Sequence, residues 1–347
     1  MSDLSNRRRG RVHYYVHGRG RGHGTRTLKV TEALTASGFT VRIFSGEDPL
    51  SMIRESHPAE AVVSLMPGRP TEWPALLRHR IRAGIKAIEQ DAPLTVISDG
   101  DLPGLIAAKR CGIPSIAVGR AEVFGETVRP PCAPLLPWVR ESLSAKISSF
   151  TATRHVAVSF VASEPKNRGT LTAAPAVETI VRRPMPDLDA VCYFRDENGG
   201  DILRCLSDAN LEFALFSRAP DAAFPQNISL RTFPLERSAF LDALGRTRAV
   251  IASAGSQLTS ECAAAGIPLF ALHAANDDEQ RINVALIKTA GIGDGTSFEA
   301  FEPTRLRKFL AAHRSGSTPV RRIPAPTQRV DEAVCGLVEA LAARSLP

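Results

Sequence analysis

The chain has 347 residues, of which 44% are hydrophobic and 23% are charged, and this balance excludes a disordered or fibrous protein. Its 43 basic and 36 acidic residues leave a formal net charge of +7, a modest excess that suits a phosphorylated ligand or an anionic membrane surface. Zinc-finger spacing, ribonucleoprotein signatures and heptad repeats are missing from the sequence, so nucleic acid is not an expected partner. A chain this long usually builds two cores, and two domains of similar size are therefore expected.

The first half of the chain alternates short apolar runs with helical patterns. The apolar run at 12–16 follows a basic start, but it is too short for a signal peptide and predicts a buried strand. Further strands are expected at 39–43, 94–98 and 115–118, and helices at 25–37 and 102–111. Strand, helix and strand joined by short loops predict parallel βαβ units. Residues 1–180 are therefore expected to form a Rossmann-like, doubly wound α/β domain.

The same pattern restarts after a proline-bearing stretch, with a linker expected near 176–188. Strands are expected at 190–194, 213–217, 228–232, 249–253 and 269–272, and helices at 201–207, 238–244 and 256–265. Residues 181–327 are therefore expected to form a second Rossmann-like domain, and the last helix, at 328–343, to pack back on the first. Ligands of open α/β sheets bind at the carboxyl ends of the strands, so two such domains are expected to face a central cleft.

A glycine-rich loop follows the first expected strand. Gly18, Gly20 and Gly22 alternate there, and His23 stands at the entrance to the first helix. Glycines let the backbone approach a ligand, and helix N-terminal amides favour anions. The spacing is not the dinucleotide-binding fingerprint, because the third glycine of that motif is missing from its place. His23 is a candidate general base near neutral pH, while a plain strand-to-helix turn is the alternative for the glycines.

Asp99 is the expected partner of His23. It ends the strand at 94–98 on the same side of the domain, where its carboxylate can hold the imidazole tautomer and stabilise an imidazolium. The alternative makes Asp99 the N-cap of the helix that starts at Leu102 or a turn residue, and Asp101 competes for both roles.

The most specific pattern is the strand-to-helix passage at 251–265. The amides of Gly255 and Ser256 can receive a diphosphate at the positive end of the helix. Gln257 and Glu261 share another face of that helix, four residues apart, and Glu261 can reach the vicinal hydroxyls of a ribose.

A second polar cluster follows the strand expected at 269–272. An acidic residue beside an amide, as in Glu279 and Gln280, suits the hydroxyls of a hexose, which need an acceptor and a donor together. For the neighbouring Asp277 and Asp278 we favour the alternative, a polar loop with a helix cap.

These blocks resemble the nucleotide-sugar glycosyltransferases of the GT-B fold, and most of all the murein N-acetylglucosaminyltransferase type. The resemblance rests on Gly20-x-Gly22-His23-x-x-Arg26 near the N-terminus and, near the C-terminus, on Ser253-Ala254-Gly255-Ser256, Glu261, Ala265-Gly266-Ile267-Pro268, Glu279-Gln280 and Asn283. It implies an acceptor-side N-terminal domain and a donor-binding C-terminal domain.

The resemblance also implies roles for single residues. His23 and Asp99 would be the base and its carboxylate partner, and Phe233 would lie where relatives hold the nucleotide base. Asn283 would support the loop of Glu279 and Gln280. The expected donor-binding residues are Gly20, Gly22, Phe233, Ser253, Gly255, Ser256, Gln257, Glu261, Glu279, Gln280 and Asn283. Plant-type relatives carry a histidine where Ser253 stands, and the murein enzyme carries a glutamine where Glu279 stands, which leaves the donor base and hexose open.

The expected reaction is transfer of a hexose or N-acetylhexosamine from a nucleoside-diphosphate sugar, UDP-linked, to a hydroxyl acceptor. No metal and no cofactor beyond that co-substrate are expected, and the resemblance favours inversion. Three alternatives stay open. The chain could be a nucleotide-sugar hydrolase or 2-epimerase on the same fold, or a non-catalytic nucleotide-sugar-binding subunit. Alternatively, Asp99-Gly100-Asp101 or Asp187-Leu188-Asp189 could be the Asp-x-Asp metal motif of the GT-A fold, which leaves the 253–283 block unexplained.

The acceptor, a small molecule or a lipid-linked one, leaves few marks in the sequence. The apolar stripe of the helix expected at 75–90, with Val123, Phe124 and the segment 129–138, suits contact with a lipid-linked or anionic acceptor at a membrane surface. We favour the alternative of a core-packed helix and a surface loop. The six scattered cysteines are typical of reduced thiols and predict a cytoplasmic protein, at the inner membrane face if the acceptor is a lipid.

Overall fold

The computed structural model describes residues 9–16, 21–46, 48–58, 62–64, 73–194, 199–217, 230–233, 236–314 and 325–344. The chain divides into two compact units, which are Met1–Arg129, Val139–Ala176 and Ala325–Pro347 for unit 1, and Pro130–Trp138 and Val177–Pro324 for unit 2. The main division after Ala176 lies close to the boundary expected at residue 180. Pro130–Trp138, in contrast, belongs to unit 2 by its contacts, although the sequence places it within the first domain.

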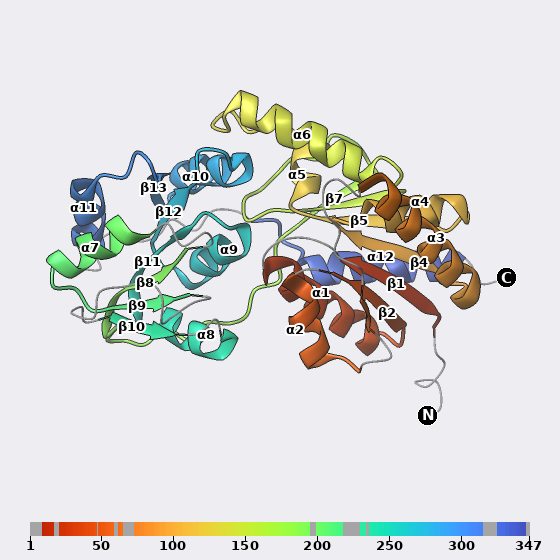
Figure 1. Ribbon diagram of the computed structural model, residues 1–347, viewed down its shortest axis with the longest axis horizontal. Helices are drawn as coiled ribbons and strands as arrows, with labels where there is room; N and C mark the ends of the chain where they lie inside the picture. The colour runs from red at the N-terminus through yellow and green to blue at the C-terminus, as the bar shows by residue number, and fades with distance from the viewer. Residues whose placement is uncertain are drawn as a thin grey trace. The chain divides into compact units, whose positions relative to one another are not determined.

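Unit 1 is built on a seven-stranded parallel sheet with the strand order β3-β2-β1-β4-β5-β6-β7 (Figure 1). The first six strands from β3 to β6 follow the order of a Rossmann sheet. The strands are β1 (Arg11–Val16), β2 (Thr40–Ser45), β3 (Val62–Ser64), β4 (Thr95–Asp99), β5 (Ser115–Gly119), β6 (Arg154–Val158) and β7 (Thr170–Ala173).

Helices cover both faces of this sheet. They are α1 (Arg21–Ala36), α2 (Asp48–Ser56), α3 (Trp73–Asp91), α4 (Leu102–Arg110), α5 (Ala121–Glu126), α6 (Leu135–Ser149) and α12 (Val330–Arg344). Successive side chains of a strand point to opposite faces of the sheet, so Tyr14 and Tyr15 of β1 lie on different faces. The Tyr14 face packs against α1 and α12, and the Tyr15 face against α3 and α4. The last helix, which the sequence places at 328–343, thus belongs to the core of unit 1.

Helix α1 begins four residues earlier than the sequence predicts. Gly22 and His23 therefore lie in its first turn and not in a loop before it, while Gly18 and Gly20 lie outside the described residues. Glycine is a poor helix former, which is why the pattern predicts a later start. Packing overrides this preference, because a Cβ at Gly24 would lie only 2.9 Å from the sulfur of Met52 in α2. Helices α1 and α2 thus approach closely at Gly24, and a small residue there favours the contact.

The segments considered for a membrane-bound acceptor differ in burial, because α3 and α5 bury apolar side chains whereas Leu135 and Leu136, in the segment 129–138, are exposed. Ile81 and Ile88 of α3 lie in the core, as do Val123 and Phe124 of α5. Helix α3 also packs closely on α4, since a Cβ at Gly84 would lie 2.9 Å from the Cβ of Ala107. The favoured interpretation of a core-packed helix therefore holds for α3. Among the described residues, none of the helices has both the length and the apolar character needed to span a bilayer.

Unit 2 repeats the architecture with a six-stranded parallel sheet of order β10-β9-β8-β11-β12-β13. Its strands are β8 (Leu188–Tyr193), β9 (Phe213–Phe216), β10 (Leu230–Phe233), β11 (Thr247–Ser253), β12 (Leu269–His273) and β13 (Gly293–Ser297). Its helices are α7 (Gly200–Asp208), α8 (Arg237–Arg246), α9 (Ser256–Ala265), α10 (Asp278–Ala290) and α11 (Pro303–Arg314). Both units are thus doubly wound and Rossmann-like, as the sequence predicts.

The register of each sheet decides where the polar strand ends meet. In unit 1, Val16 at the end of β1 pairs with Asp99 at the end of β4. Because α1 starts shortly after β1, its first turn lies at the same edge of the sheet as Asp99. In unit 2, Ser253 ends β11 beside Leu272 of β12, so α9 and α10 both begin at one edge.

Candidate active site

Three side chains of unit 1 form a hydrogen-bonded cluster at the edge of the sheet where β1 and β4 end. The Nδ1 atom of His23 lies 2.8 Å from Oδ1 of Asp99. Arg26, one turn further along α1, donates from Nε to Oδ2 and from Nη2 to Oδ1 of the same carboxylate, each at 2.7 Å. The expected contact between His23 and Asp99 is present, and Arg26 is a third member whose contact with Asp99 the sequence does not reveal.

Arg26 and His23 keep Asp99 ionised although it is buried. Its side chain is only 1% exposed, and burial alone would raise its pKa. The charges and hydrogen bonds of Arg26 and His23 outweigh burial and lower the pKa of Asp99 to about 2. An ionised carboxylate can only accept hydrogen bonds, so His23 must carry its proton on Nδ1. In the neutral form of this ring Nε2 carries the lone pair, and the imidazole is 30% exposed.

Asp101 resolves the competition for the helix cap. Its Oδ1 accepts a hydrogen bond from the amide of Gly104 at 2.7 Å, so Asp101 is the N-cap of α4 and Asp99 is not. The same carboxylate forms an ion pair with Arg80 of α3. Both carboxylates of this Asp-x-Asp triplet are thus bound to arginines.

The second Asp-x-Asp triplet is similarly occupied. Asp187 forms an ion pair with Arg246, and Asp189 accepts from the amide of Glu212 at 3.2 Å. In the described part of the chain, no group of three or more histidine, cysteine, aspartate or glutamate side chains is arranged to hold a metal ion.

Gly119 makes room for the cluster. It ends β5 with φ of +148°, a conformation that residues with a side chain rarely adopt. A Cβ at this position would lie 3.3 Å from Oδ1 of Asp99 and 3.6 Å from Nη2 of Arg26. A side chain would therefore press on the carboxylate that holds His23. Neither the spacing nor the neighbours of Gly119 in the sequence point to this role.

In unit 2, a tight turn connects β11 with α9. Gly255 is the N-cap residue of the helix, and its amide donates to the carbonyl of Ser253 at 2.7 Å. That amide is already used, so the helix end offers a ligand the amides that follow, beginning with Ser256. Asn283 of α10 is fully buried and donates from Nδ2 to the carbonyl of Ala254 at 2.9 Å. Asn283 therefore holds the 253–256 turn, whereas the resemblance implies support of the Glu279–Gln280 loop.

Glu261 lies one and a half turns into α9 and is 1% exposed. Arg237 of α8 donates to both of its oxygens, at 2.6 and 3.3 Å, and Gln257 donates to Oε1 at 2.9 Å. Arg237 also lies 3.6 Å from the carboxylate of Glu178. The expected neighbours Gln257 and Glu261 are thus in contact, and Arg237 is a partner that only the folded chain reveals.

The start of α10 combines a cap with a buried acceptor. Asp277 is the N-cap, accepting from the amide of Gln280 at 2.9 Å and from its side-chain Nε2 at 2.8 Å. The cap favoured from the sequence is therefore present. The Oε1 atom of Gln280 is buried and has no hydrogen-bond partner. A buried acceptor without a donor costs about 1–3 kcal/mol, which a ligand hydroxyl would recover. Glu279 lies beside it and is half-buried.

Phe233 ends β10 and belongs to an aromatic cluster. Its ring stacks on Phe216 of β9 with 5.2 Å between the centroids, and Phe240 of α8 meets Phe216 edge-on at 4.9 Å. The ring is half-buried, so one part of it is open to a ligand.

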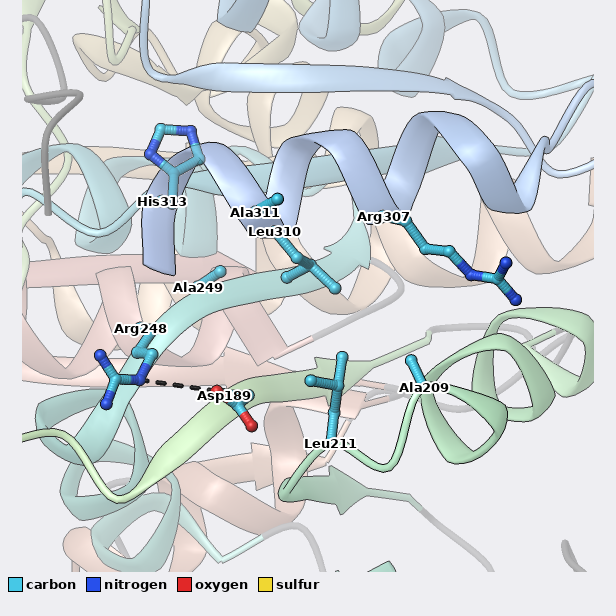
Figure 2. A pocket seen from close by; sticks show the side chains of 9 residues that line it. All are labelled: Asp189, Ala209, Leu211, Arg248, Ala249, Arg307, Leu310, Ala311 and His313. Atoms are coloured by element: carbon cyan, nitrogen blue, oxygen red, sulfur yellow. Dashed lines mark ion pairs between the residues drawn. The ribbon is translucent and has the colours of Figure 1, made fainter. Parts of the chain in front are cut away.

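A cavity of about 160 Å³ lies at the opposite edge of the unit 2 sheet (Figure 2). Asp189 near the start of β8 and Arg248 and Ala249 near the start of β11 form one wall, and Leu310, Ala311 and His313 of α11 form another. Ser253 stands at the other end of β11. This cavity is therefore not the place where the candidate donor-binding residues gather.

Comparison with solved structures identifies the fold. MurG from Acinetobacter baumannii matches with a TM-score of 0.64 and 16% identity over 95% of this chain and 99% of that chain. The UDP-GlcNAc 2-epimerase from Methanocaldococcus jannaschii matches with a TM-score of 0.63 and 10% identity over 95% and 99%. LpCGTa, solved in complex with UDP, matches with a TM-score of 0.61 and 14% identity over 96% and 95%. The architecture is that of the GT-B enzymes.

Sequence comparison then identifies the family. The profile of glycosyl transferase family 1 matches residues 71–313, which is more than half of the chain. The chain belongs to glycosyl transferase family 1, and it is a glycosyltransferase. No curated protein matches it significantly in sequence.

Proposed function

We propose that this enzyme transfers a hexose from a UDP-linked donor to a hydroxyl acceptor, with inversion, without a divalent metal and with His23 as the base. The observation that carries the proposal is the 2.8 Å contact between Nδ1 of His23 and the buried, ionised Asp99. It fixes the tautomer in which Nε2 of a partly exposed imidazole can accept a proton.

The base and its partners have separate tasks in the proposed reaction. As the acceptor oxygen attacks the anomeric carbon, its proton moves to Nε2 of His23, and the bond from that carbon to the diphosphate oxygen breaks with its electron pair. Asp99 stabilises the imidazolium that forms, and Arg26 keeps Asp99 ionised and oriented. A single displacement of this kind inverts the anomeric configuration.

The leaving diphosphate gains negative charge as the bond breaks. We assign its binding to Ser253, Ser256 and the first-turn amides of α9, with Gly255 allowing close approach. The helix dipole contributes about 0.3–2 kcal/mol, and preorganised hydrogen bonds have to supply the larger share. This arrangement gives the leaving group a partner that is not a metal ion.

The residues that would bind the ribose, base and hexose of the donor are assigned by the chemistry of their side chains. Glu261, oriented by Arg237 and Gln257, would accept hydrogen bonds from the ribose, and Phe233 would contact the base. Gln280, with its unpartnered Oε1, and Glu279 would bind the hexose hydroxyls. The UDP complex of LpCGTa supports a uridine donor. A lipid-linked or a small soluble acceptor is compatible with this assignment.

The test is the comparison of His23→Ala and His23→Gln with the wild-type enzyme. We expect kcat to fall by about 10²–10⁴ while the donor dissociation constant, measured by calorimetry with UDP-sugar, stays within twofold. Retained turnover in both variants would show that His23 is not the base. Activity should survive a chelator, and a loss that Mg²⁺ or Mn²⁺ restores would overturn the metal-independent mechanism.

A second function is favoured by the likeness to the 2-epimerase from M. jannaschii. Hydrolysis or epimerisation of the donor would use the same diphosphate site without a sugar acceptor. Incubating UDP-sugar alone with the enzyme and following it by NMR separates the two functions. Release of free sugar or of an epimer at a rate that depends on His23 would favour this alternative over transfer.

A further inference from the structure

The cavity of about 160 Å³ in unit 2 has the size and the lining of a site for a small apolar group. Alanines leave the space open, since Ala209, Ala249 and Ala311 occupy three positions of its lining. Leu211 and Leu310 face one another across it from the sheet side and from α11 (Figure 2). An apolar cavity of about 150 Å³ can hold a molecule of the size of benzene. The cavity therefore suits one six-membered ring or a branched chain of similar volume.

The sequence of α11 explains why this space is not filled by the protein itself. Leu306 and Phe309 are buried and anchor the helix on the sheet, where the ring of Phe309 meets Phe270 edge-on at 5.4 Å. The next positions of the same helical face are Leu310, which is only half-buried, and His313. The His313 ring lies edge-on against Phe309, with 4.7 Å between the centroids. The apolar stripe of α11 thus ends beside the cavity with an imidazole in place of a large apolar side chain.

The charged groups around the cavity leave one cation without a carboxylate. At one end, Oδ1 of Asp189 lies 3.5 Å from Nε of Arg248, and Asp189 also accepts from the amide of Glu212. This acid and this base neutralise one another. At the other end (Figure 2), Arg307 is exposed and lies beside the thiol of Cys205. Among the residues that the structure describes, no carboxylate forms an ion pair with Arg307. An anionic group of a ligand in the cavity would therefore find its partner there.

We propose that this cavity binds a small carboxylate that carries one apolar ring or branched chain. Its body lies between Leu211 and Leu310, and its carboxylate pairs with Arg307, because a guanidinium and a carboxylate match in geometry as well as in charge. Strand β11 passes the cavity near its start, with Arg248 and Ala249, and reaches Ser253 only at its other end. The site is thus separate from the candidate donor-binding residues. The proposal goes beyond glycosyl transfer and does not depend on the base or on the donor.

The experiment is titration of the full chain with benzoate, followed by calorimetry and by saturation-transfer NMR. We expect a dissociation constant of about 0.1–1 mM, the range open to a ligand of this size. Benzyl alcohol keeps the ring and loses the charge, whereas acetate keeps the charge and loses the ring. Each should bind about tenfold more weakly than benzoate, because each lacks one of the two contacts. UDP should not displace benzoate, and displacement would place the probe in the donor site and overturn the proposal.

Two variants with matched controls locate the site. Arg307→Gln should weaken benzoate binding about tenfold and leave benzyl alcohol binding unchanged, whereas Lys308→Gln, at an exposed position outside the lining, should bind like the wild type. Ala311→Leu should weaken the binding of both probes about tenfold because the larger side chain takes up part of the cavity. Ala312→Leu, at the next exposed position of α11, is its control.

All four changes lie at exposed positions, so the thermal unfolding temperature should stay close to that of the wild type and a loss of binding should not reflect a loss of fold. A wild type that binds benzyl alcohol or acetate as tightly as benzoate overturns the proposal. So does benzoate binding that is the same in Arg307→Gln and Ala311→Leu as in their controls.

Discussion

Removing the guanidinium of Arg26 should destabilise the fold because it leaves Asp99 buried with one partner instead of two. In the folded chain the pKa of Asp99 is about 2, against an ordinary value of 3.8. Ionisation of this carboxyl therefore stabilises the fold by about 2 kcal/mol above pH 4. The sign follows from the lowered pKa, so this contribution is present above 3.8 and is lost as the pH falls through 2.

Arg26→Met should lower the free energy of unfolding by about 3–5 kcal/mol at pH 7, the usual cost of removing one partner of a buried ion pair. Urea unfolding at pH 7, 5 and 3 measures it. The acid-induced loss of stability between pH 5 and 3 should be smaller in the variant, because the pKa of Asp99 is no longer held as low.

The control is the double variant Arg26→Met with Asp99→Asn, which removes both charges. It should be more stable than the sum of the two single losses predicts, with a coupling energy of about 1–3 kcal/mol. The reasoning is refuted if Arg26→Met costs less than about 1 kcal/mol or if the two changes are additive, since either result means that the carboxylate does not depend on Arg26.

Two further predictions follow from the geometry of unit 1. Gly119→Ala should cost about 1–3 kcal/mol of stability and lower kcat, because the new Cβ presses on Asp99. Gly112→Ala is the matched control, since it also has positive φ but its Cβ would meet nothing within 4 Å, and it should leave kcat unchanged; equal kinetic effects of the two changes would contradict the contact with Asp99. His13 is fully buried, and burial lowers its pKa to about 4 despite the hydrogen bond to Asp91. Its contribution to stability is complete above pH 6.5 and is lost as the pH falls through 4, so wild-type stability should decrease by about 2 kcal/mol from this residue between pH 7 and 5. His13→Phe should remove that part of the pH dependence in urea unfolding, and an unchanged slope would exclude His13 as its source.

The central strands of both sheets were predictable because they are buried on both faces, whereas β3, β6, β7 and β13 were not predicted. Apolar runs bounded by glycine and proline locate β1, β4 and β11 to within two residues. The start of α1 was not predictable, because Gly22 and Gly24 argue for a loop, and the close approach of Met52 in α2 to Gly24 is visible only in the folded chain.

In the candidate site, too, some residues are predictable from local sequence pattern and others are revealed only by the folded chain. Residues at strand ends or helix starts, such as His23, Asp99 and Ser256, could be recognised from local pattern alone. Arg26 belongs to the motif that carries the resemblance, but its contact with Asp99 could not be recognised, and neither could that of Gly119. These contacts bridge 73 and 20 positions of the chain and carry no local signal. Arg237 was missed for the same reason, since its partner Glu261 lies 24 residues away.

The place of α12 affects how the nascent protein can fold. Val330, Val334 and Val338 fill the same core as β1, although more than 300 residues separate them along the chain. During synthesis, the N-terminal strands leave the ribosome long before the helix that covers them. One apolar face of the first sheet must therefore wait uncovered, or be shielded by a chaperone, until α12 has been synthesised, whereas residues 177–324 can form their own core beforehand.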